Sequence, residues 1–372
     1  MRVVCNKNIL IQNINIVTKA VTTKTTLPIL ECILLIADRK GFRLMSNDLE
    51  LSIETSNMDC DVFDLGTVAV DAKIFSNIIK SMPGDVISIE TDENNITYIK
   101  SDRSEFKIPG QPGDKFPMPP EVEKNQIITM KSIDFKNMVR KTIFSVATEE
   151  IRPILTGEFI EIEGKYLNMV AIDGYRISYR RIKLENFDNY IEFVVPAKTL
   201  SEITKIGADD ETNINMYFTD RHILIEMNEC TIVSRLLEGE FLDYKSNFMQ
   251  DYKTKVTINR NMFLSSLERS LLISKENKKT PVKLTINSDI MDVYAVTELG
   301  EVYDQIPISC QGEELVIGFN PKYLIDVVRS VDEDEIDLYF TGGSLAPCII
   351  KNEMVDDEFE RCYKYLVLPL KL

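Results

Sequence analysis

Apolar side chains recur at helical spacing in six stretches of the chain. The predicted helices cover residues 5–20, 70–82, 132–147, 196–206, 260–274 and 320–331. Elsewhere apolar and polar residues alternate, as in EFIEIEGKYLNMVAIDGYRISYRRI, where Gly164 and Gly174 mark turns. Alternation of this kind is typical of antiparallel strands with one buried face. We therefore expect an α+β protein in which helices pack on antiparallel sheets.

The same order of segments occurs three times along the chain. Pro28 in TTLPILECILL corresponds to Pro153 in EIRPILTGEFI, 125 residues later. Lys73 in AVDAKIFSNIIKSM corresponds in the same way to Lys198 in VVPAKTLSEITKIG and to Lys322 in GFNPKYLIDVVRSV. Units of this length are too large for solenoid repeats, so each is predicted to be a domain with two helices. The predicted domains are residues 1–125, 126–251 and 252–372.

Composition places the chain among folded cytoplasmic proteins. Hydrophobic residues make up 44% of the sequence, and no run of 18 apolar residues indicates a membrane span. The first residues, MRVVCNKNILIQNIN, lack the long apolar stretch of a signal peptide. The seven cysteines are scattered and form no C-x-x-C motif, which is typical of reduced thiols in the cytosol.

Positive charge is concentrated on the predicted helices, although the chain as a whole carries −16. The second helix of each repeat has two basic residues seven positions apart, which places them on one stripe of the helix. These pairs are Lys73 and Lys80, Lys198 and Lys205, and Lys322 and Arg329. Counted with flanking residues as 5–20, 70–82, 131–147, 196–206, 259–275 and 320–331, the six helical segments sum to +10, so the remainder carries −26. Two interpretations remain open: ordinary solvated helix faces, or a surface that follows a polyanion without reading its sequence.

Catalytic signatures are scarce. His222 is the single histidine and has no partner histidine for a metal site, and no phosphate-binding glycine motif occurs. The run DEDEID at 332–337 could bind a divalent cation in a metal-dependent enzyme, but a solvated acidic loop is the simpler interpretation. TGGS at 341–344 is predicted to be a hairpin turn. We expect no catalytic residues, no metal and no cofactor.

The chain ends in the apolar stretch YKYLVLPLKL, whereas termini are usually polar. One interpretation is a last strand buried in the core. The other is a tail that lines a binding groove, which Pro369 favours because proline cannot donate to a central strand ladder.

Several ordered motifs together resemble one family, the bacterial DNA sliding clamp, or β subunit of DNA polymerase III. The motifs are TLPIL (26–30), AIDGYRIS (171–178), SRLLEGEFLDY (234–244), IGFNPKYLIDVV (317–328) and YLVLPLKL (365–372). The resemblance implies a head-to-tail dimer closed into a ring of six domains, with helices around the hole and sheets outside. It implies a processivity factor that encircles double-stranded DNA and is not an enzyme. The alternative to this function is a similar scaffold that does not encircle DNA.

The resemblance also implies which residues function. The DNA-facing residues would be Lys24, Lys73, Lys80, Arg140, Lys141, Lys198, Lys205, Lys322 and Arg329. The groove would take a short peptide of the polymerase III catalytic subunit, the clamp loader or repair proteins, and its residues would be Leu155, Ile172, Gly174, Tyr175, Arg176, Ile177, Leu242, Leu368, Pro369, Leu370, Lys371 and Leu372. The dimer interface would contain Phe106, Leu272 and Ile273.

Two places depart from the family pattern. Leu242 stands where proline is common, and Ser246 and Asn247 stand where arginine and an aliphatic residue are common. Glu149 and Glu150 occupy a loop that would face DNA, where uncharged polar residues are more usual. The first departure would alter the groove rim, and the second would weaken phosphate contact.

Overall fold

The computed structural model describes residues 1–23, 25–148, 151–185, 187–207, 211–248, 251–273, 280–343, 345–352 and 361–372. Lys24, Glu149 and Glu150 therefore lie outside the described residues. The chain divides into two compact units, which are considered separately. Unit 1 comprises Met1–Asp134 and Glu202–Leu236, and unit 2 comprises Phe135–Ser201 and Leu237–Leu372. No helix in the described part of the chain has the length and apolar character that crossing a membrane requires.

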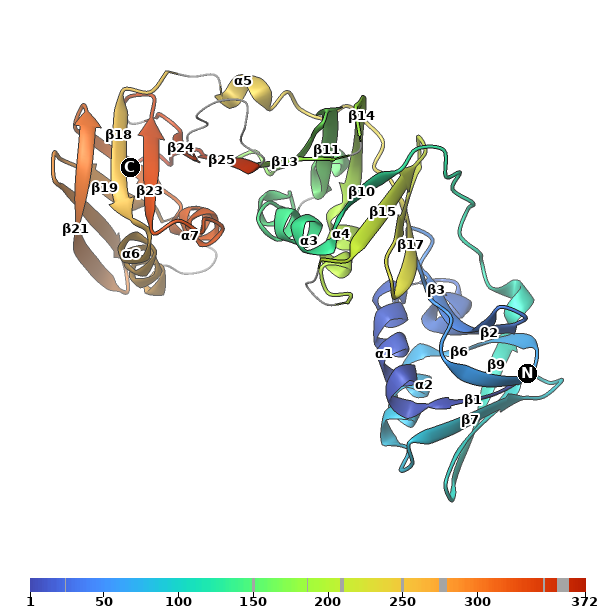
Figure 1. Ribbon diagram of the computed structural model, residues 1–372. Helices are drawn as coiled ribbons and strands as arrows, with labels where there is room; N and C mark the ends of the chain where they lie inside the picture. The colour runs from blue at the N-terminus through green and yellow to red at the C-terminus, as the bar shows by residue number, and fades with distance from the viewer. Residues whose placement is uncertain are drawn as a thin grey trace. The chain divides into compact units, whose positions relative to one another are not determined.

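Unit 1 is built on a 13-stranded antiparallel sheet (Figure 1). In spatial order its strands are β10 (Ile128–Lys131), β15 (Asn213–Phe218), β16 (His222–Glu226), β17 (Cys230–Arg235), β4 (Leu51–Thr55), β3 (Gly41–Asn47), β2 (Cys32–Asp38), β6 (Gly66–Asp71), β9 (Ser104–Pro112), β8 (Ile96–Ser101), β7 (Val86–Thr91), β1 (Arg2–Asn6) and β5 (Cys60–Asp64). The β17–β4 ladder joins the second repeat to the first, with Ile232 opposite Ile53.

Unit 2 is built on a 12-stranded antiparallel sheet. In spatial order its strands are β14 (Asn189–Pro196), β11 (Gly157–Gly164), β12 (Tyr166–Ile172), β13 (Arg176–Lys183), β25 (Arg361–Val367), β24 (Cys348–Lys351), β23 (Glu335–Phe340), β18 (Thr254–Asn259), β21 (Gly300–Gly312), β20 (Ile290–Thr297), β19 (Val282–Ile286) and β22 (Leu315–Phe319). The β13–β25 ladder joins the second repeat to the third, with Ile177 opposite Leu366. Gly342 and Gly343 adopt positive φ angles between β23 and β24, at the predicted turn.

Each repeat contributes two helices, as expected. The helices are α1 (Lys7–Val17), α2 (Ala72–Ser81), α3 (Ser132–Arg140), α4 (Ala197–Ile203), α6 (Arg260–Leu272) and α7 (Pro321–Arg329), with a single further turn at α5 (Lys245–Phe248). Asn6, Asp71, Asn259 and Asn320 cap α1, α2, α6 and α7 through side-chain oxygens that accept backbone N–H groups of the first turn. Short 3₁₀ turns begin at Pro28 and Pro153, which confirms this part of the repeat.

All six helices are shorter than their predicted ranges, and α3 differs most. We expected a helix over 132–147, but α3 ends at Arg140 because Thr142 leaves the helical conformation, with φ −128° and ψ −37°. Its hydroxyl donates back to the carbonyl oxygen of Met138 at 2.7 Å, which is a common way for threonine to compete with helix continuation. The predicted helix over 196–206 ends at Ile203, so α4 is only seven residues long.

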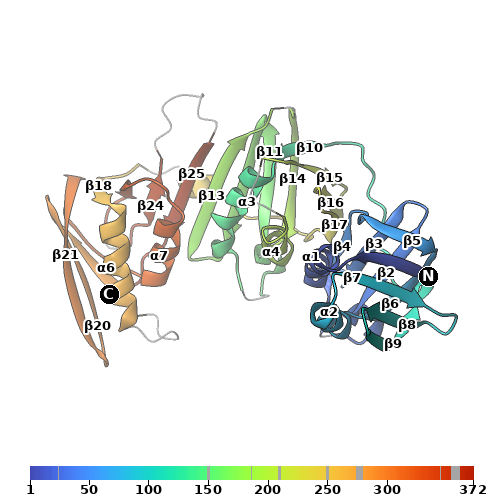
Figure 2. The same ribbon diagram turned by 60° about the horizontal axis from the view of Figure 1, so that its bottom comes forward.

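The helices pack on one face of each sheet. In unit 2, Phe263 of α6 and Leu324 of α7 join the buried cluster that contains Tyr365 of β25, and Figure 2 shows the two helices side by side. In unit 1, α1 and α2 pair in the same way, and Phe75 and Ile79 of α2 are fully buried. Each such side chain stabilises the fold by about 1.5–3 kcal/mol. Ile74 of α2, next to Phe75 in sequence, is 49% exposed and lies outside this core.

Glu158 of β11 is an unusual buried group in unit 2. Its side chain is fully buried, and one carboxyl oxygen lies within hydrogen-bond distance of the hydroxyl oxygen of Thr142, at 2.8 Å. Among the described residues, the other carboxyl oxygen has no hydrogen-bond partner. Burial raises the pKa of Glu158 well above its ordinary value, so the folded protein keeps a proton there that the unfolded chain releases.

Replacing Glu158 with glutamine should therefore increase the free energy of unfolding at pH 8 by about 1–3 kcal/mol. Because its pKa is raised in the folded state, Glu158 destabilises the fold above about pH 4.3, where the carboxyl of the unfolded chain ionises. The stability gained by E158Q should therefore shrink as the pH falls toward 4.5. Urea unfolding at both pH values measures the effect. Glu185→Gln, at an exposed position, is the matched control. Equal stability of the wild type and E158Q at pH 8 would contradict the prediction.

Candidate functional site

The C-terminal stretch divides into a buried strand and a segment on the surface. Residues 361–367 form β25, which pairs with β13 on one side and with β24 on the other. Tyr365, Leu366 and Val367 are almost completely buried. The first half of the stretch is therefore a central core strand, as one interpretation predicted.

The last five residues leave this ladder and run along the surface of unit 2. Leu368 donates its backbone N–H to the carbonyl oxygen of Tyr175 at 2.8 Å, and Leu370 donates to that of Gly318 at 2.8 Å. Pro369 lies between these two bonds, where no N–H is needed. A Cβ atom at Gly318 would lie 2.7 Å from Cδ2 of Leu372, so glycine allows the tail to approach β22. Leu368 and Leu372 remain 40% and 56% exposed.

An apolar floor lies beneath the beginning of the tail. Leu155, Ile172 and Ile177 belong to one buried cluster together with Leu366 of β25. Gly174, in the turn between β12 and β13, has a φ of +87°, a conformation that glycine adopts without strain. The structure thus brings these predicted groove residues next to the tail.

Arg176, at the start of β13, connects the turn between β12 and β13 to α7. Its guanidinium group is paired with Asp173 at 2.9 Å and with Asp326 of α7 at 2.7 Å, and it donates a third hydrogen bond to the carbonyl oxygen of Phe144. Its charge also lies 4.5 Å from the ring centre of Tyr323, an arrangement with favourable cation–π energy. Because Arg176 is 7% exposed and saturated with partners, it holds the turn and α7 together and is not available as a free cation.

The sequence analysis missed Tyr323 and Asp326. Tyr323 stacks on Tyr175 with ring centres 6.0 Å apart, and Tyr175 is 41% exposed. Both missed residues follow Lys322 at positions three apart, so they share one helix face. That spacing is the feature of the sequence that points to them.

The residues of the predicted groove rim are exposed. Leu242 is 39% exposed, and its neighbour Phe241 stacks on Phe159 at 4.7 Å. Ser246 and Asn247 lie in α5, where the backbone N–H of Ser246 donates to Asp243. Lys371 is exposed. A partner protein can reach these positions. The contacts described above do not connect them to the apolar floor beneath the tail.

Exposed lysines occupy the second residue of α2, α4 and α7. These are Lys73, Lys198 and Lys322, which agrees with the repeat. Lys80 is also exposed, near the end of α2. Among the described residues, no ion pair is recorded for Lys73, Lys80 or Lys322, so these cations can reach an external anion.

Other predicted DNA-facing residues already have anionic partners. Lys205 lies beyond the end of α4 and pairs with Glu202 at 2.8 Å. Arg329 pairs with Glu268 at 2.7 Å, and Lys141 pairs with Asp332. Arg140 is exposed at the end of α3. Lys24, the remaining member of the set, lies outside the described residues. The positive charge available at these positions is therefore smaller than the sequence suggested.

The predicted interface residues differ in exposure. Leu272, the last residue of α6, is 81% exposed, and Phe106 of β9 is 41% exposed. Ile273 is partly buried and packs against the core of unit 2. Leu272 and Phe106 have the exposure expected of residues that contact a second chain, whereas Ile273 also contributes to the fold.

The acidic run at 332–337 contacts cations of the chain itself. Asp337 pairs with Lys255 at 3.0 Å and accepts a hydrogen bond from Thr257 at 2.6 Å. His222 of β16 lies near Arg221 and Arg235, and burial together with these charges lowers its pKa. Within the described ranges, no three His, Cys, Asp or Glu side chains are grouped so that they could hold a metal ion.

Comparison with known proteins identifies the family. Models of the N-terminal, central and C-terminal domains of the DNA polymerase III beta subunit match residues 1–120, 129–243 and 245–370. A beta sliding clamp of Halalkalibacterium halodurans is 34% identical over 94% of this chain and 95% of its own length.

Solved structures agree with this assignment. A putative DNA polymerase III beta subunit from Eubacterium rectale is 40% identical, with a TM-score of 0.94 over 100% of this chain and 99% of its own. The DNA polymerase sliding clamp of Bacillus subtilis is 31% identical, with a TM-score of 0.94 and the same coverage. The chain, with its three clamp domains, therefore belongs to the DNA polymerase III beta subunit family, the bacterial sliding clamps.

Proposed function

We propose that this protein is a replication processivity factor: a ring that encircles double-stranded DNA and tethers the replicative polymerase. The observation that carries the proposal is the match of all three clamp domains over residues 1–370, in order and with short gaps. Exposed Lys73, Lys198 and Lys322 support it, since they repeat at the same position of three helices and can contact phosphates without reading sequence.

A closed ring requires two chains joined head to tail. Such an interface is heterologous, and it ends in a finite assembly only if the rotation closes. We assign one half of the interface to Phe106 and the other to Leu272, two exposed apolar side chains in the first and third repeats. Ile273 supports the second half from beneath.

Partner proteins would dock on the groove formed by the tail, the floor residues and α7. We assign to this groove the twelve residues that the resemblance implied, and we add Tyr323. An apolar peptide side chain buried there contributes about 1.5–3 kcal/mol before ordering costs, which suits binding that must be exchanged. The partners would be the polymerase III catalytic subunit, the clamp loader and repair proteins.

Catalytic activity is no part of this proposal, nor is a metal or cofactor. A protein that acts on the bacterial chromosome works in the cytoplasm, which is where we place it. The test of function is retention on DNA: the protein, loaded onto a nicked circular plasmid, should stay bound through gel filtration and should be lost once the circle is cut. Equal loss from circular and linear DNA would favour a scaffold that does not encircle DNA.

The ring predicts that Leu272→Glu gives monomers. A charge placed at an 81% exposed position should leave the fold intact but oppose burial against a second chain. Sedimentation velocity at micromolar concentration measures the mass, and thermal melting checks the fold. Glu268→Gln, one turn earlier on α6, is the control and should remain dimeric. A dimeric L272E, or a monomeric wild type, would contradict the assigned interface.

The DNA contact predicts that changing Lys73, Lys198 and Lys322 to glutamate shortens retention on circular DNA by about one order of magnitude or more, because phosphate attraction becomes repulsion. The dimer and the melting temperature should not change. A control with the same charge change, Lys40→Glu with Lys165→Glu and Lys283→Glu, alters exposed lysines outside the helices and should retain DNA normally. Similar retention by both triple variants would refute the helix assignment.

The groove predicts that deleting residues 368–372 abolishes peptide binding while preserving the fold. The deletion removes two backbone hydrogen bonds and leaves β25 complete, so we expect a loss of about 1–3 kcal/mol of stability rather than unfolding. Fluorescence anisotropy with a labelled clamp-binding peptide of the polymerase measures docking. Val367→Ala, a core substitution on the same strand, is the control and should still bind. Undiminished binding by the truncated protein would exclude this groove.

A further inference from the structure

Three cations meet on the face of the unit 2 sheet that α6 and α7 do not cover. Lys351 of β24 lies directly opposite Lys364 of β25, and Arg181 lies on the adjacent strand β13. Along β25, Tyr363 and Tyr365 belong to the core beneath the helices, so Lys364 between them points to the other face. In the part of the chain that the structure describes, none of the three cations forms an ion pair.

This arrangement is unfavourable unless an anion is present. Like charges directly opposite each other on neighbouring strands destabilise a sheet. Burial, together with the charges of Lys351 and Arg181, lowers the pKa of Lys364. Nearby lysines are paired in the usual way, since Lys245 contacts Glu161 at 2.9 Å and Lys255 contacts Asp337 at 3.0 Å. Lys364 and its two neighbours have no such partner among the described residues, although they face one another.

Open cavities flank Lys364 on both sides. The larger one has a volume of about 320 Å³, within the range of small-molecule sites. Besides Lys364 its lining comprises Tyr179, Tyr244, Phe248, Arg181, and the paired Lys245 and Glu163. The smaller one contains Lys351 as well as Lys364. The charge of Lys364 lies 5.8 Å from the ring centres of Tyr179 and Phe248. A ligand here would meet aromatic surface and positive charge together.

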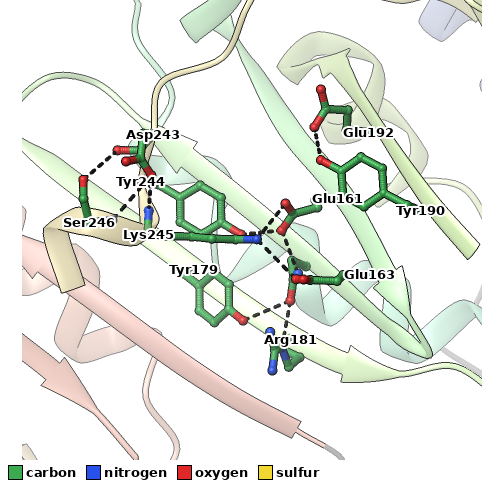
Figure 3. A network of polar contacts seen from close by, with 11 residues as sticks. Glu161, Glu163, Tyr179, Arg181, Tyr190, Glu192, Asp243, Tyr244, Lys245 and Ser246 are labelled. Carbon is green, nitrogen blue, oxygen red and sulfur yellow. Dashed lines mark hydrogen bonds and ion pairs between the residues drawn. The ribbon is translucent and has the colours of Figure 1, made fainter. Parts of the chain in front are cut away.

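A polar network holds the walls of the larger cavity in place (Figure 3). Glu161 accepts hydrogen bonds from the hydroxyl of Tyr244 at 2.6 Å and from Lys245 at 2.9 Å. Burial opposes ionisation of Glu161, but these bonds outweigh it and hold its pKa below the ordinary value. The hydroxyl of Tyr179 and Nε of Arg181 both donate to Asn168 at 2.9 Å, and Figure 3 shows the two side chains next to each other on one strand. The cavity is thus preorganised, and Lys364 remains available.

We propose that the two neighbouring cavities, which share Lys364 and Phe248, together bind a nucleoside polyphosphate, with its phosphates on Lys364, Lys351 and Arg181 and its base against Phe248. The site is separate from the groove and from the basic helices. Its cations supply the charge that a polyphosphate needs, and the exposed part of Phe248 offers a flat apolar surface for a ring. A long nucleic acid strand fits less well, because three cations on a chain of net charge −16 offer few phosphate contacts.

Isothermal titration calorimetry with ATP on the full-length protein tests the proposal. ATP should bind with 1:1 stoichiometry per chain, and adenosine and inorganic pyrophosphate should each bind at least about tenfold more weakly, since each lacks half of the contacts. Lys351→Gln with Lys364→Gln should lower ATP affinity by about tenfold or more. Lys283→Gln, an exposed lysine that lines neither cavity, should bind like the wild type.

Several results would overturn the proposal. Absence of ATP binding at millimolar concentration, or equal affinity in the wild type and the double glutamine variant, would exclude the site. Equal binding of pyrophosphate and ATP would exclude the role of Phe248. Residues 353–360, which lie outside the described residues, contain five carboxylates in sequence. If ATP binds only after these are changed to amides, the chain's own carboxylates occupy the cations and the proposal is wrong.

Discussion

Strand pairing between repeats is the interaction on which the remaining structure depends. Neither the β17–β4 ladder nor the β13–β25 ladder connects neighbours in sequence, yet both continue a sheet from one repeat into the next. A repeat alone would expose unpaired edge strands, which tend to pair with other chains. When the repeats pair, these edge strands gain hydrogen-bonded neighbours, and each sheet has a fixed order of strands. The helices, the tail and the aromatic cavity all take their positions from these sheets.

Whether a cation of this protein is accessible depends on its ion-pair partners and not only on the net charge. Glu202 and Glu268 neutralise Lys205 and Arg329, whereas Lys73 and Lys322 remain unpaired among the described residues. Salt screens interactions between exposed charges over about 8–10 Å, so acidic residues far from a helix have little effect on a phosphate bound there. A few accessible cations on the helix are then enough to contact it. The protein can therefore be strongly acidic overall and still present local positive charge.

The repeat, the two helices per domain and the antiparallel sheets could all be predicted, because they follow from local periodicity. The end of α3 could not, since Thr142 terminates the helix through a hydroxyl contact that competes with an otherwise helical pattern. The motif AIDGYRIS predicts that Arg176 belongs to the groove. Its partner Asp326 is 150 residues away in sequence, and no local pattern reveals such a pair. The meeting of Lys351 with Lys364 likewise depends on strand register, which one sequence does not specify.

The tail has a consequence for how this protein can change over time. Val367 is the last residue that the core needs, whereas Leu368 to Leu372 are held by two backbone bonds and leave much of their apolar surface exposed. In the groove that we propose, a substitution in these five residues would alter docking for every partner at once without unfolding the protein. Selection on the tail would then come from the whole set of partners, and their docking peptides would have to diverge together with it.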